Sequence, residues 1–116
     1  MAIRERQLGQ ALPADTNAVS IYSPGNNVTA VITSIYVCNV TGNTPSYRIF
    51  VDDNGTTYST ATALFYDNAT AANTTERIET FIAMNDASGN IAVRSSAASE
   101  ICFTVFGYEI IKNLNA

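Results

Sequence analysis

Short apolar runs alternate with turn residues along the chain from residue 18 onward. Clusters of Gly, Pro, Asn and Asp separate these runs, which return at intervals of about 8–12 residues, the spacing of a β-sandwich or β-barrel. Val, Ile, Thr, Tyr and Phe dominate the runs, and these residue types favour strands. The pattern therefore predicts strands at 18–23, 28–39, 46–52, 63–67, 91–95 and 100–110.

The segment Thr74–Met84 admits two interpretations. Ile78, Phe81 and Ile82 have the i, i+3, i+4 spacing of an amphipathic helix. The three threonines of the segment are β-branched, however, and they lower its helix propensity. We predict a strand here. The expected fold is therefore all-β: a single-domain antiparallel β-sandwich of jelly-roll-like form, with seven or eight strands within residues 18–111.

The two ends of the chain do not share this pattern. Residues 1–17 have no clean period, and they contain the charged run Arg4–Arg6 together with Gly9 and Pro13. We predict that they form an N-terminal arm, which in an assembly would lie across a neighbour. Residues 112–116 are predicted to be a C-terminal tail. Because the N-terminus is charged where a signal peptide is apolar, and because no apolar stretch reaches membrane-spanning length, we expect synthesis in a cytosol.

Two of the predicted strands carry apolar side chains on both faces. In the last strand the two faces hold Ile101, Phe103 and Val105 on one side, and Cys102, Thr104, Phe106 and Tyr108 on the other. In the strand 28–39 we assign Val31, Ile35 and Val37 to one face and Ile32, Tyr36 and Cys38 to the other. A strand with one face in water is polar on that face. The second face is therefore expected to be covered, either by another part of this chain or by another chain. Because a domain of this size has one core, we favour a neighbouring subunit for part of it. Gly107 predicts a bulge or the close approach of another backbone.

The charge of the protein is low and slightly acidic. Charged residues make up 14% of the chain and the net charge is −4, whereas about 25% of residues are charged in an average domain. The six basic residues are dispersed, so no patch is expected that could neutralise a run of phosphates. Nucleic acid is therefore not an expected partner. A surface so poor in charge suits a subunit that packs against neighbours.

The sequence lacks the residues that most catalytic and metal sites require. It has no histidine, which excludes Ser-His and Cys-His nucleophilic pairs and most zinc sites. Its six glycines are scattered, so it has no glycine-rich phosphate loop. Cys38 and Cys102 are expected to be reduced, packed thiols, although a bridge between them stays open. We expect neither an enzyme nor a bound cofactor, and a small-molecule ligand is not expected.

Acidic residues provide the remaining candidate chemistry. Asp52–Gly55 resembles the start of a calcium loop, but Leu64 stands where such a loop has its last glutamate. Aspartates before a glycine in a turn are usually solvated turn formers. Glu76 and Glu79 cannot be paired with a second acid site for glycosidase chemistry from sequence alone. No catalytic, cofactor-binding or metal-binding residue is therefore predicted.

Aromatic residues that share a face with polar residues are the better functional candidates. Tyr and Phe are enriched in protein interfaces, although packing of the second face is an equally good explanation. The basic residues of the predicted arm would meet the same neighbour. The predicted interface residues are Arg4, Arg6, Tyr36, Phe50, Phe106 and Tyr108.

Several segments together resemble a group of small proteins from tailed bacteriophages. The matching segments are Leu8–Gln10, Ser34–Asn39, Tyr47–Val51, Leu64–Asp67 and Cys102–Ile110. The resemblance covers most of the chain, although each segment alone is generic strand sequence. It implies a β-sandwich structural protein of the virion, either a decoration or cement protein of the head or a module of the neck, tail or fibre. The resemblance brings no catalytic motif with it.

Two functions follow as hypotheses. The first is a capsid decoration or cement subunit, expected to be a homotrimer in the virion, that bridges major-capsid subunits through many weak contacts. The second is a tail, fibre or neck module that binds a host glycan or another virion protein through its loops. These loops are Thr41–Pro45, Asp52–Thr60 and Asn68–Thr75, and the absence of Trp disfavours sugar stacking. A hydrolase that uses acids alone ranks far behind, and no membrane partner is expected.

Overall fold

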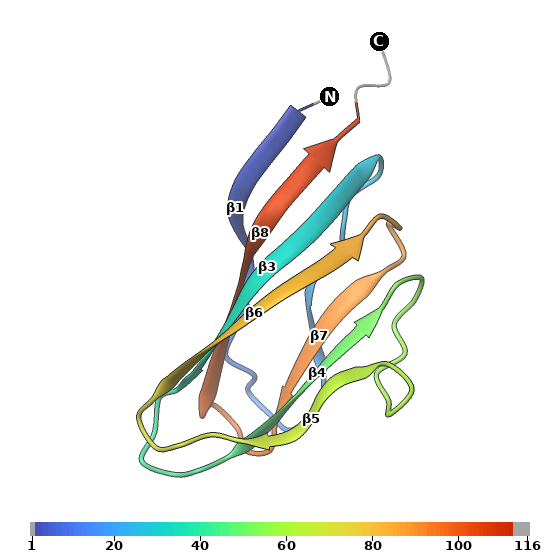
Figure 1. Ribbon diagram of the computed structural model, residues 1–116. Coiled ribbons are helices and arrows are strands. Elements are labelled where there is room, and N and C mark those ends of the chain that lie inside the picture. Colours follow the sequence, from blue (N-terminus) through green and yellow to red (C-terminus); the bar gives the residue numbers. More distant parts are fainter. Residues whose placement is uncertain (1, 113–116) are drawn as a thin grey trace.

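A computed structural model describes residues 2–112, and this part of the chain contains eight strands (Figure 1). They are β1 (Ala2–Ala11), β2 (Val19–Tyr22), β3 (Val28–Asn39), β4 (Ser46–Asp52), β5 (Ala63–Ala69), β6 (Thr75–Met84), β7 (Asn90–Ser95) and β8 (Ile101–Ile111).

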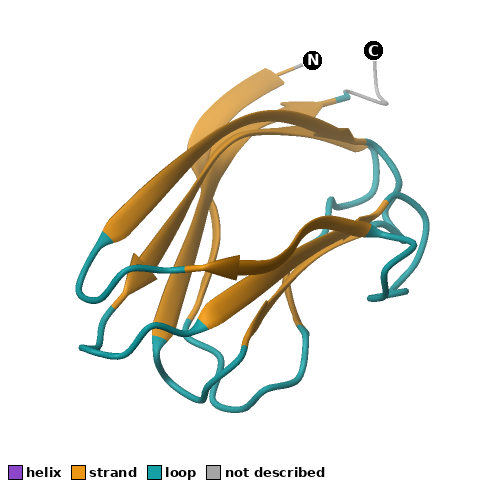
Figure 2. Cartoon of the chain, turned by 60° about the horizontal axis from the view of Figure 1, so that its bottom comes forward, coloured by secondary structure: helices purple, strands orange, loops and turns teal. Residues whose placement is uncertain are grey.

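The strands form two antiparallel sheets of four, in the orders β1-β8-β3-β6 and β2-β7-β4-β5. The two sheets face each other as layers, with the loops gathered at their ends (Figure 2). Strand pairs β1·β8, β2·β7, β3·β6 and β4·β5 show that the chain is wound as one long folded ribbon. The pairs β1·β8 and β3·β6 lie in one sheet, and the pairs β2·β7 and β4·β5 lie in the other. This arrangement is an eight-stranded jelly roll.

The seven segments predicted as strands correspond to β2–β8, so the predicted all-β sandwich is confirmed. β3 and β4 have the predicted bounds, and the others differ by one or two residues at an end. The ambiguous segment Thr74–Met84 is the strand β6, because its backbone pairs with β3 along most of its length. Strand pairing therefore prevails over the helical spacing of its apolar residues.

The predicted N-terminal arm is wrong in its bounds. Ala2–Ala11 is a regular edge strand that pairs with β8, so the sandwich begins near the N-terminus and only the connection 12–18 is irregular. Sequence alternation failed here because Arg4 and Arg6 occupy inward-facing positions and a bulge at Leu8 interrupts the pairing. Of the predicted tail, residues 113–116 lie outside the described part of the chain.

Inward-facing side chains of both sheets form one core. Tyr47 and Phe103 meet edge to face, with ring centroids 6.1 Å apart and an interplanar angle of 72°. The Tyr47 hydroxyl donates a hydrogen bond to Glu76, and burial together with this bond raises the pKa of Tyr47 to about 12. The side chains of the core that have no exposed surface include Ile32, Ile35, Ile49, Ile91, Val93, Ile101 and Val105.

A bulge in β3 changes the faces that the sequence predicted for this strand. The register shifts between Ile32 and Ser34, which leaves Thr33 without a partner on β8. Ile32 therefore joins Ile35 and Val37 in the core, whereas Val31 lies on the opposite face beside Tyr108, the reverse of the predicted assignment for Val31 and Ile32.

Gly107 lies against this bulge. A Cβ atom at Gly107 would be only 2.0 Å from the carbonyl oxygen of Val31 and 3.0 Å from the Cα atom of Ile32. This contact confirms the predicted close approach of another backbone, and it requires glycine because any side chain would collide with β3.

Candidate interaction surface

The solvent side of the sheet β1-β8-β3-β6, which we call the outer face, brings together three of the predicted interface residues. Tyr36, Phe106 and Tyr108 all project from this face, because they alternate with buried residues of β3 and β8. Tyr36 and Phe106 pack edge to face, with ring centroids 5.5 Å apart and an interplanar angle of 84°. Their positions in the two central strands hold the rings on a rigid base.

A shallow groove of about 450 Å³ runs across the outer face beside these rings. Three strands line it with Gln7, Gln10, Ser34, Tyr36, Thr104 and Phe106. Gln10 donates a hydrogen bond from its Nε2 to the Thr104 Oγ1 at 2.9 Å, which fixes one wall. The lining is aromatic and neutral-polar, with no carboxylate and no basic side chain, so the groove suits a protein surface better than a charged ligand.

The two charges on the β6 side of the outer face balance each other. Arg77 and Glu79 follow one another on the same face of β6, opposite Tyr36 and Ser34, and their Nη2 and Oε1 atoms are 3.0 Å apart. Both side chains are well exposed, so the pair adds little to stability. Its effect is to leave this side of the outer face nearly neutral.

Large apolar side chains are exposed along both edges of the same sheet. Phe81 on β6 is 73% exposed, Ile3 on β1 is 62% exposed and Phe106 between them is 37% exposed. The sequence pattern did not single out Phe81, because its i, i+3, i+4 spacing grouped it with Ile78 and Ile82, whereas in β6 it alternates with them and is exposed. Three large apolar side chains exposed across one sheet of a small protein favour an interaction site on this sheet.

Phe50, a predicted interface residue, is not available on the surface. It is only 3% exposed, because the β4–β5 loop folds back over the second sheet and places Tyr58 against it, with ring centroids 6.1 Å apart. The Tyr58 hydroxyl donates to Asn90 Oδ1 at 3.0 Å and holds the loop in place. Sequence alternation correctly put Phe50 outside the core, but it could not reveal the loop that covers it.

Arg4 and Arg6 lie at the open side of the sandwich, where they neutralise a buried carboxylate. Glu109 is 5% exposed, and its Oε1 is 2.9 Å from Arg4 Nη2 and 3.3 Å from Arg6 Nη1. Tyr22 donates its hydroxyl to Glu109 Oε2 at 2.6 Å. These contacts give both arginines a structural role within the chain, although each remains about half exposed at the surface.

The ionisation of Glu109 follows from these contacts. Burial alone would raise the pKa of Glu109, but hydrogen bonds from Tyr22 and Arg4 and the charges of both arginines bring it below its ordinary value. Burial and the bond to Glu109 raise the pKa of Tyr22. The carboxylate is therefore ionised at neutral pH and joins β8 to β1 and to β2 of the other sheet.

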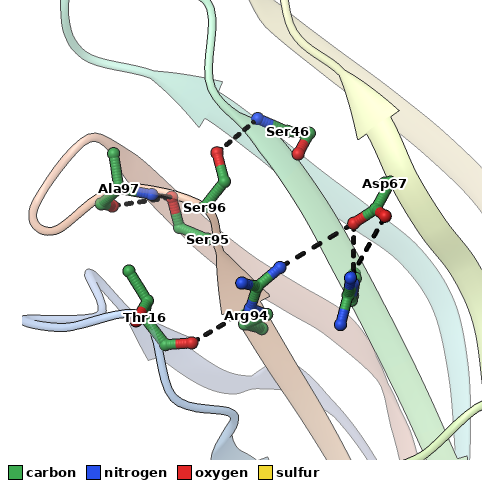
Figure 3. A network of polar contacts seen from close by, with 8 residues as sticks. Thr16, Ser46, Asp67, Arg94, Ser95, Ser96 and Ala97 are labelled. Carbon is green, nitrogen blue, oxygen red and sulfur yellow. Dashed lines mark hydrogen bonds and ion pairs between the residues drawn. The ribbon is translucent and has the colours of Figure 1, made fainter.

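A second polar cluster lies on the outside of the other sheet (Figure 3). Arg48 and Arg94 face each other across β4 and β7, and Asp67 contacts both, at 2.7 Å from Arg48 Nε and 3.7 Å from Arg94 Nη1. Hydrogen bonding to Arg48 holds the pKa of Asp67 below its ordinary value. Arg94 also donates to the backbone oxygen of Thr16 at 3.0 Å, which anchors the β1–β2 connection.

The loops proposed for recognition do not form one surface. The β3–β4 and β5–β6 loops meet at one end, where Asn39 Nδ2 donates to Asn43 O at 2.7 Å and to Ala71 O at 3.1 Å. The β4–β5 loop lies at the opposite end, against Asn90 at the start of β7. A single loop-based site could therefore include at most two of the three predicted loops.

The acidic residues are engaged in local structure. Asp52 accepts hydrogen bonds from the backbone N–H groups of Thr57 at 2.9 Å and Asn54 at 3.2 Å, and these bonds lower its pKa. Glu76 and Glu79 lie opposite Val37 and Ser34, which point to opposite faces of the sheet, so the two carboxylates do not converge.

Residues 2–112 contain no group of three or more side chains that could hold a metal ion. In the same range no helix is long and apolar enough to cross a membrane.

Comparisons with known proteins give a structural likeness alone. No family model matches the sequence, and no curated protein matches it. The whole chain aligns with part of a chain in the structure of infectious bursal disease virus, Gx strain, with a TM-score of 0.54 and 13% identity. An alignment to a chain of the Gt strain covers 93% of this chain and 28% of that chain at 10% identity, with a TM-score of 0.42, too low to establish a common fold.

The protein spans 35% of the length of the Gx-strain chain. At so low an identity the likeness shows that the two share a fold, and fold alone does not fix function. The geometry and the comparison together show that the protein is a jelly-roll sandwich, and that part of a chain in a virus structure has the same fold.

Proposed function

We propose that this protein is a non-enzymatic structural subunit of a virus particle, and that its outer face is the surface through which it assembles. The observation that carries the proposal is the outer face itself: a grooved sheet surface with exposed aromatic side chains and few charges, which are the Arg77–Glu79 ion pair and Glu5 opposite Tyr108. Such a surface is unfavourable in water and gains free energy when another protein covers it.

Three observations support a place in a virion. The jelly roll is a common architecture of viral capsid domains, and the structural likeness is to a chain of a virus. Segments of the sequence resemble small structural proteins of tailed bacteriophages. Within that class, we propose a capsid decoration or cement protein, which bridges major-capsid subunits and thereby stabilises the shell.

The proposed assembly is a homotrimer. Three copies present three binding surfaces at once, so weak individual contacts with a shell combine into strong overall binding. The low charge favours this arrangement, because repeated copies at close range do not repel each other strongly. The exposed Phe81 and Phe106 and the half-buried Tyr36 are the side chains that we expect to be covered in the assembly.

The first experiment measures the solution mass of the purified protein by light scattering on a sizing column. We expect a trimer for the wild type and a shift toward monomer for Phe106→Ser and Phe81→Ser. The matched control is Leu64→Ser, which changes a 52% exposed apolar residue on the other sheet and should leave the trimer intact. A monomeric wild type would overturn the self-association, as would equal effects of all three substitutions.

The second experiment tests the virion role directly by co-sedimentation with shells assembled from the major capsid protein of the same virus. We expect the wild type to sediment with shells and to raise the temperature at which they break open. Phe106→Ser should bind less, and Leu64→Ser should bind normally. Absence of binding by a correctly folded wild type would exclude the decoration role.

The alternative function is a tail, fibre or neck module that recognises a host glycan or another virion protein. One observation favours it: the β3–β4 loop is fixed as a polar platform, in which Thr41 and Asn43 both donate to Glu100 at 3.3 Å. A glycan array distinguishes the two functions. Binding to a defined sugar that is lost in Asn43→Ala and retained in Phe106→Ser would favour recognition over decoration.

A further inference from the structure

The fold places the only two cysteines of the chain directly opposite each other. Cys38 lies in β3 and Cys102 in β8, and they are Cα partners across the two central strands of the sheet. Their neighbours along the strands, Val37 and Asn39 on one side and Ile101 and Phe103 on the other, are buried on the core side. Both thiols therefore point to the outer face, where both are half-buried.

The hydrogen-bond pattern sets the spacing of the two cysteines. The Val40 N–H donates to the Glu100 carbonyl at 2.9 Å, so these two residues form a hydrogen-bonded pair of the antiparallel ladder. Such pairs recur at every second position, which makes Cys38 and Cys102 a hydrogen-bonded pair as well. Facing Cα atoms in these pairs are about 5.5 Å apart, within the range of about 4.4–6.8 Å that a disulfide spans.

We propose that Cys38 and Cys102 form a reversible thiol–disulfide pair: free thiols in a reducing cytosol, and a disulfide between β3 and β8 once the protein meets a low-molecular-weight disulfide as oxidant. This inference does not depend on the proposed function. It differs from ordinary packing of cysteine in the core, because here both sulfur atoms lie on the solvent side of one sheet.

The reaction is a double thiol–disulfide exchange. The sulfur of one cysteine, after loss of its proton, attacks one sulfur of the oxidant and releases one low-molecular-weight thiol. The sulfur of the second cysteine then attacks the resulting mixed disulfide and releases the second thiol. The two cysteine protons end on the two released thiols, the cysteines are oxidised by two electrons, and the oxidant is reduced by the same two.

The geometry predicts a bond that is easily reduced. Facing Cβ atoms on a sheet are about 4.5–5.5 Å apart, whereas a relaxed disulfide brings them to about 3.8 Å. Closing the bond therefore draws β3 and β8 together slightly and leaves strain, and strained or exposed disulfides are the more reducible ones. The bond would lie next to the groove, because Cys38 and Cys102 are two residues from Tyr36 and Thr104 along their strands and on the same face.

The test uses the purified full-length protein, first reduced, then incubated with oxidised glutathione and finally treated with an alkylating agent. We expect an intact mass lower than that of the reduced protein by two hydrogen atoms, with no alkyl group added and a monomer on a non-reducing gel. Excess reduced glutathione should restore two alkylatable thiols. Cys38→Ser and Cys102→Ser are the matched controls, and each should retain a single glutathione adduct.

Other outcomes would overturn the proposal. Wild-type protein that carries two glutathione adducts would show that the second exchange does not occur. Complete alkylation after oxidation would show that no disulfide forms, and covalent dimers would show that the thiols react between molecules instead. A bond that survives excess reduced glutathione would overturn its reversibility.

Discussion

Tyr22 on one sheet donates its hydroxyl to Glu109 on the other at 2.6 Å, and this hydrogen bond closes the open side of the sandwich. The carboxylate of Glu109 also contacts two arginines of β1, so the same group holds the N-terminal edge strand. Removing any one of these donors should lower the stability of the fold, because the buried carboxylate would be left partly unsatisfied.

The first prediction concerns the pH dependence of stability. Because the pKa of Glu109 is below its ordinary value of 4.5 in the folded protein, its contribution is present above that value and is lost as pH falls through the folded pKa. Glu109→Gln should destabilise the protein at neutral pH by about 1–2 kcal/mol and should flatten the fall in stability below pH 4.5. Urea unfolding of both proteins across this pH range checks it, and parallel curves would contradict it.

The second prediction separates core from surface in β8. Phe103 has no exposed surface, so Phe103→Ala should lower the free energy of unfolding by about 3–5 kcal/mol. Phe106→Ala, three residues further along the strand but on the outer face, should change folding stability much less and association more. Unfolding and solution-mass measurements on both variants test this. Equal losses of folding stability would show that the two faces are not distinct.

The third prediction concerns the glycine beside the bulge. Gly107→Ala places a Cβ atom 2.0 Å from the Val31 carbonyl oxygen. Overpacking a core typically lowers the free energy of unfolding by about 1–3 kcal/mol, and we expect a larger loss here because the clash is with backbone. Gly42→Ala is the matched control, because nothing lies within 4 Å of its added Cβ. Thermal unfolding of the two variants should differ clearly. A Gly107→Ala protein as stable as the control would show that the bulge can move.

The fourth prediction concerns the two facing arginines on the other sheet. Asp67→Asn removes the carboxylate between Arg48 and Arg94, and asparagine tolerates the backbone φ of 54° at this position. The remaining arginines repel each other, and salt screens repulsion. The melting temperature of Asp67→Asn should therefore rise with salt relative to that of the wild type. An unchanged salt dependence would mean that the arginines move apart freely.

Much of the fold was predictable from the sequence because its strands are separated by clear turns and because most core positions alternate. Alternation alone placed Ile101, Phe103 and Val105 on one face of the last strand, and the structure buries all three completely. Alternation did not predict the faces of a strand where the backbone has a bulge, and it did not predict a strand where charged side chains point inward. The bulge at Thr33 reversed Val31 and Ile32, and the inward arginines concealed β1.

The candidate surface was predictable only in part. Tyr36, Phe106 and Tyr108 were found because they share a strand face with polar residues, and the structure gathers them on the outer face. Phe50 satisfied the same criterion, but Tyr58, which lies in a loop, covers it. Arg4 and Arg6 are explained by Glu109, a residue more than a hundred positions away, and strand pairing over such a separation leaves no local pattern.

The position of β8 between β1 and β3 determines when the sheet β1-β8-β3-β6 can form during synthesis. β1 is synthesised before the other seven strands and β8 after them, so β1 has no backbone partner in its own sheet until β8 has been made. The pairing β4·β5 joins neighbouring segments and so has the smallest loop-closure cost, whereas β1·β8 joins the most distant strands and has the largest. A ribosome that stalls before Ile101 would therefore hold a chain with one complete sheet and an unpaired, charged N-terminal strand.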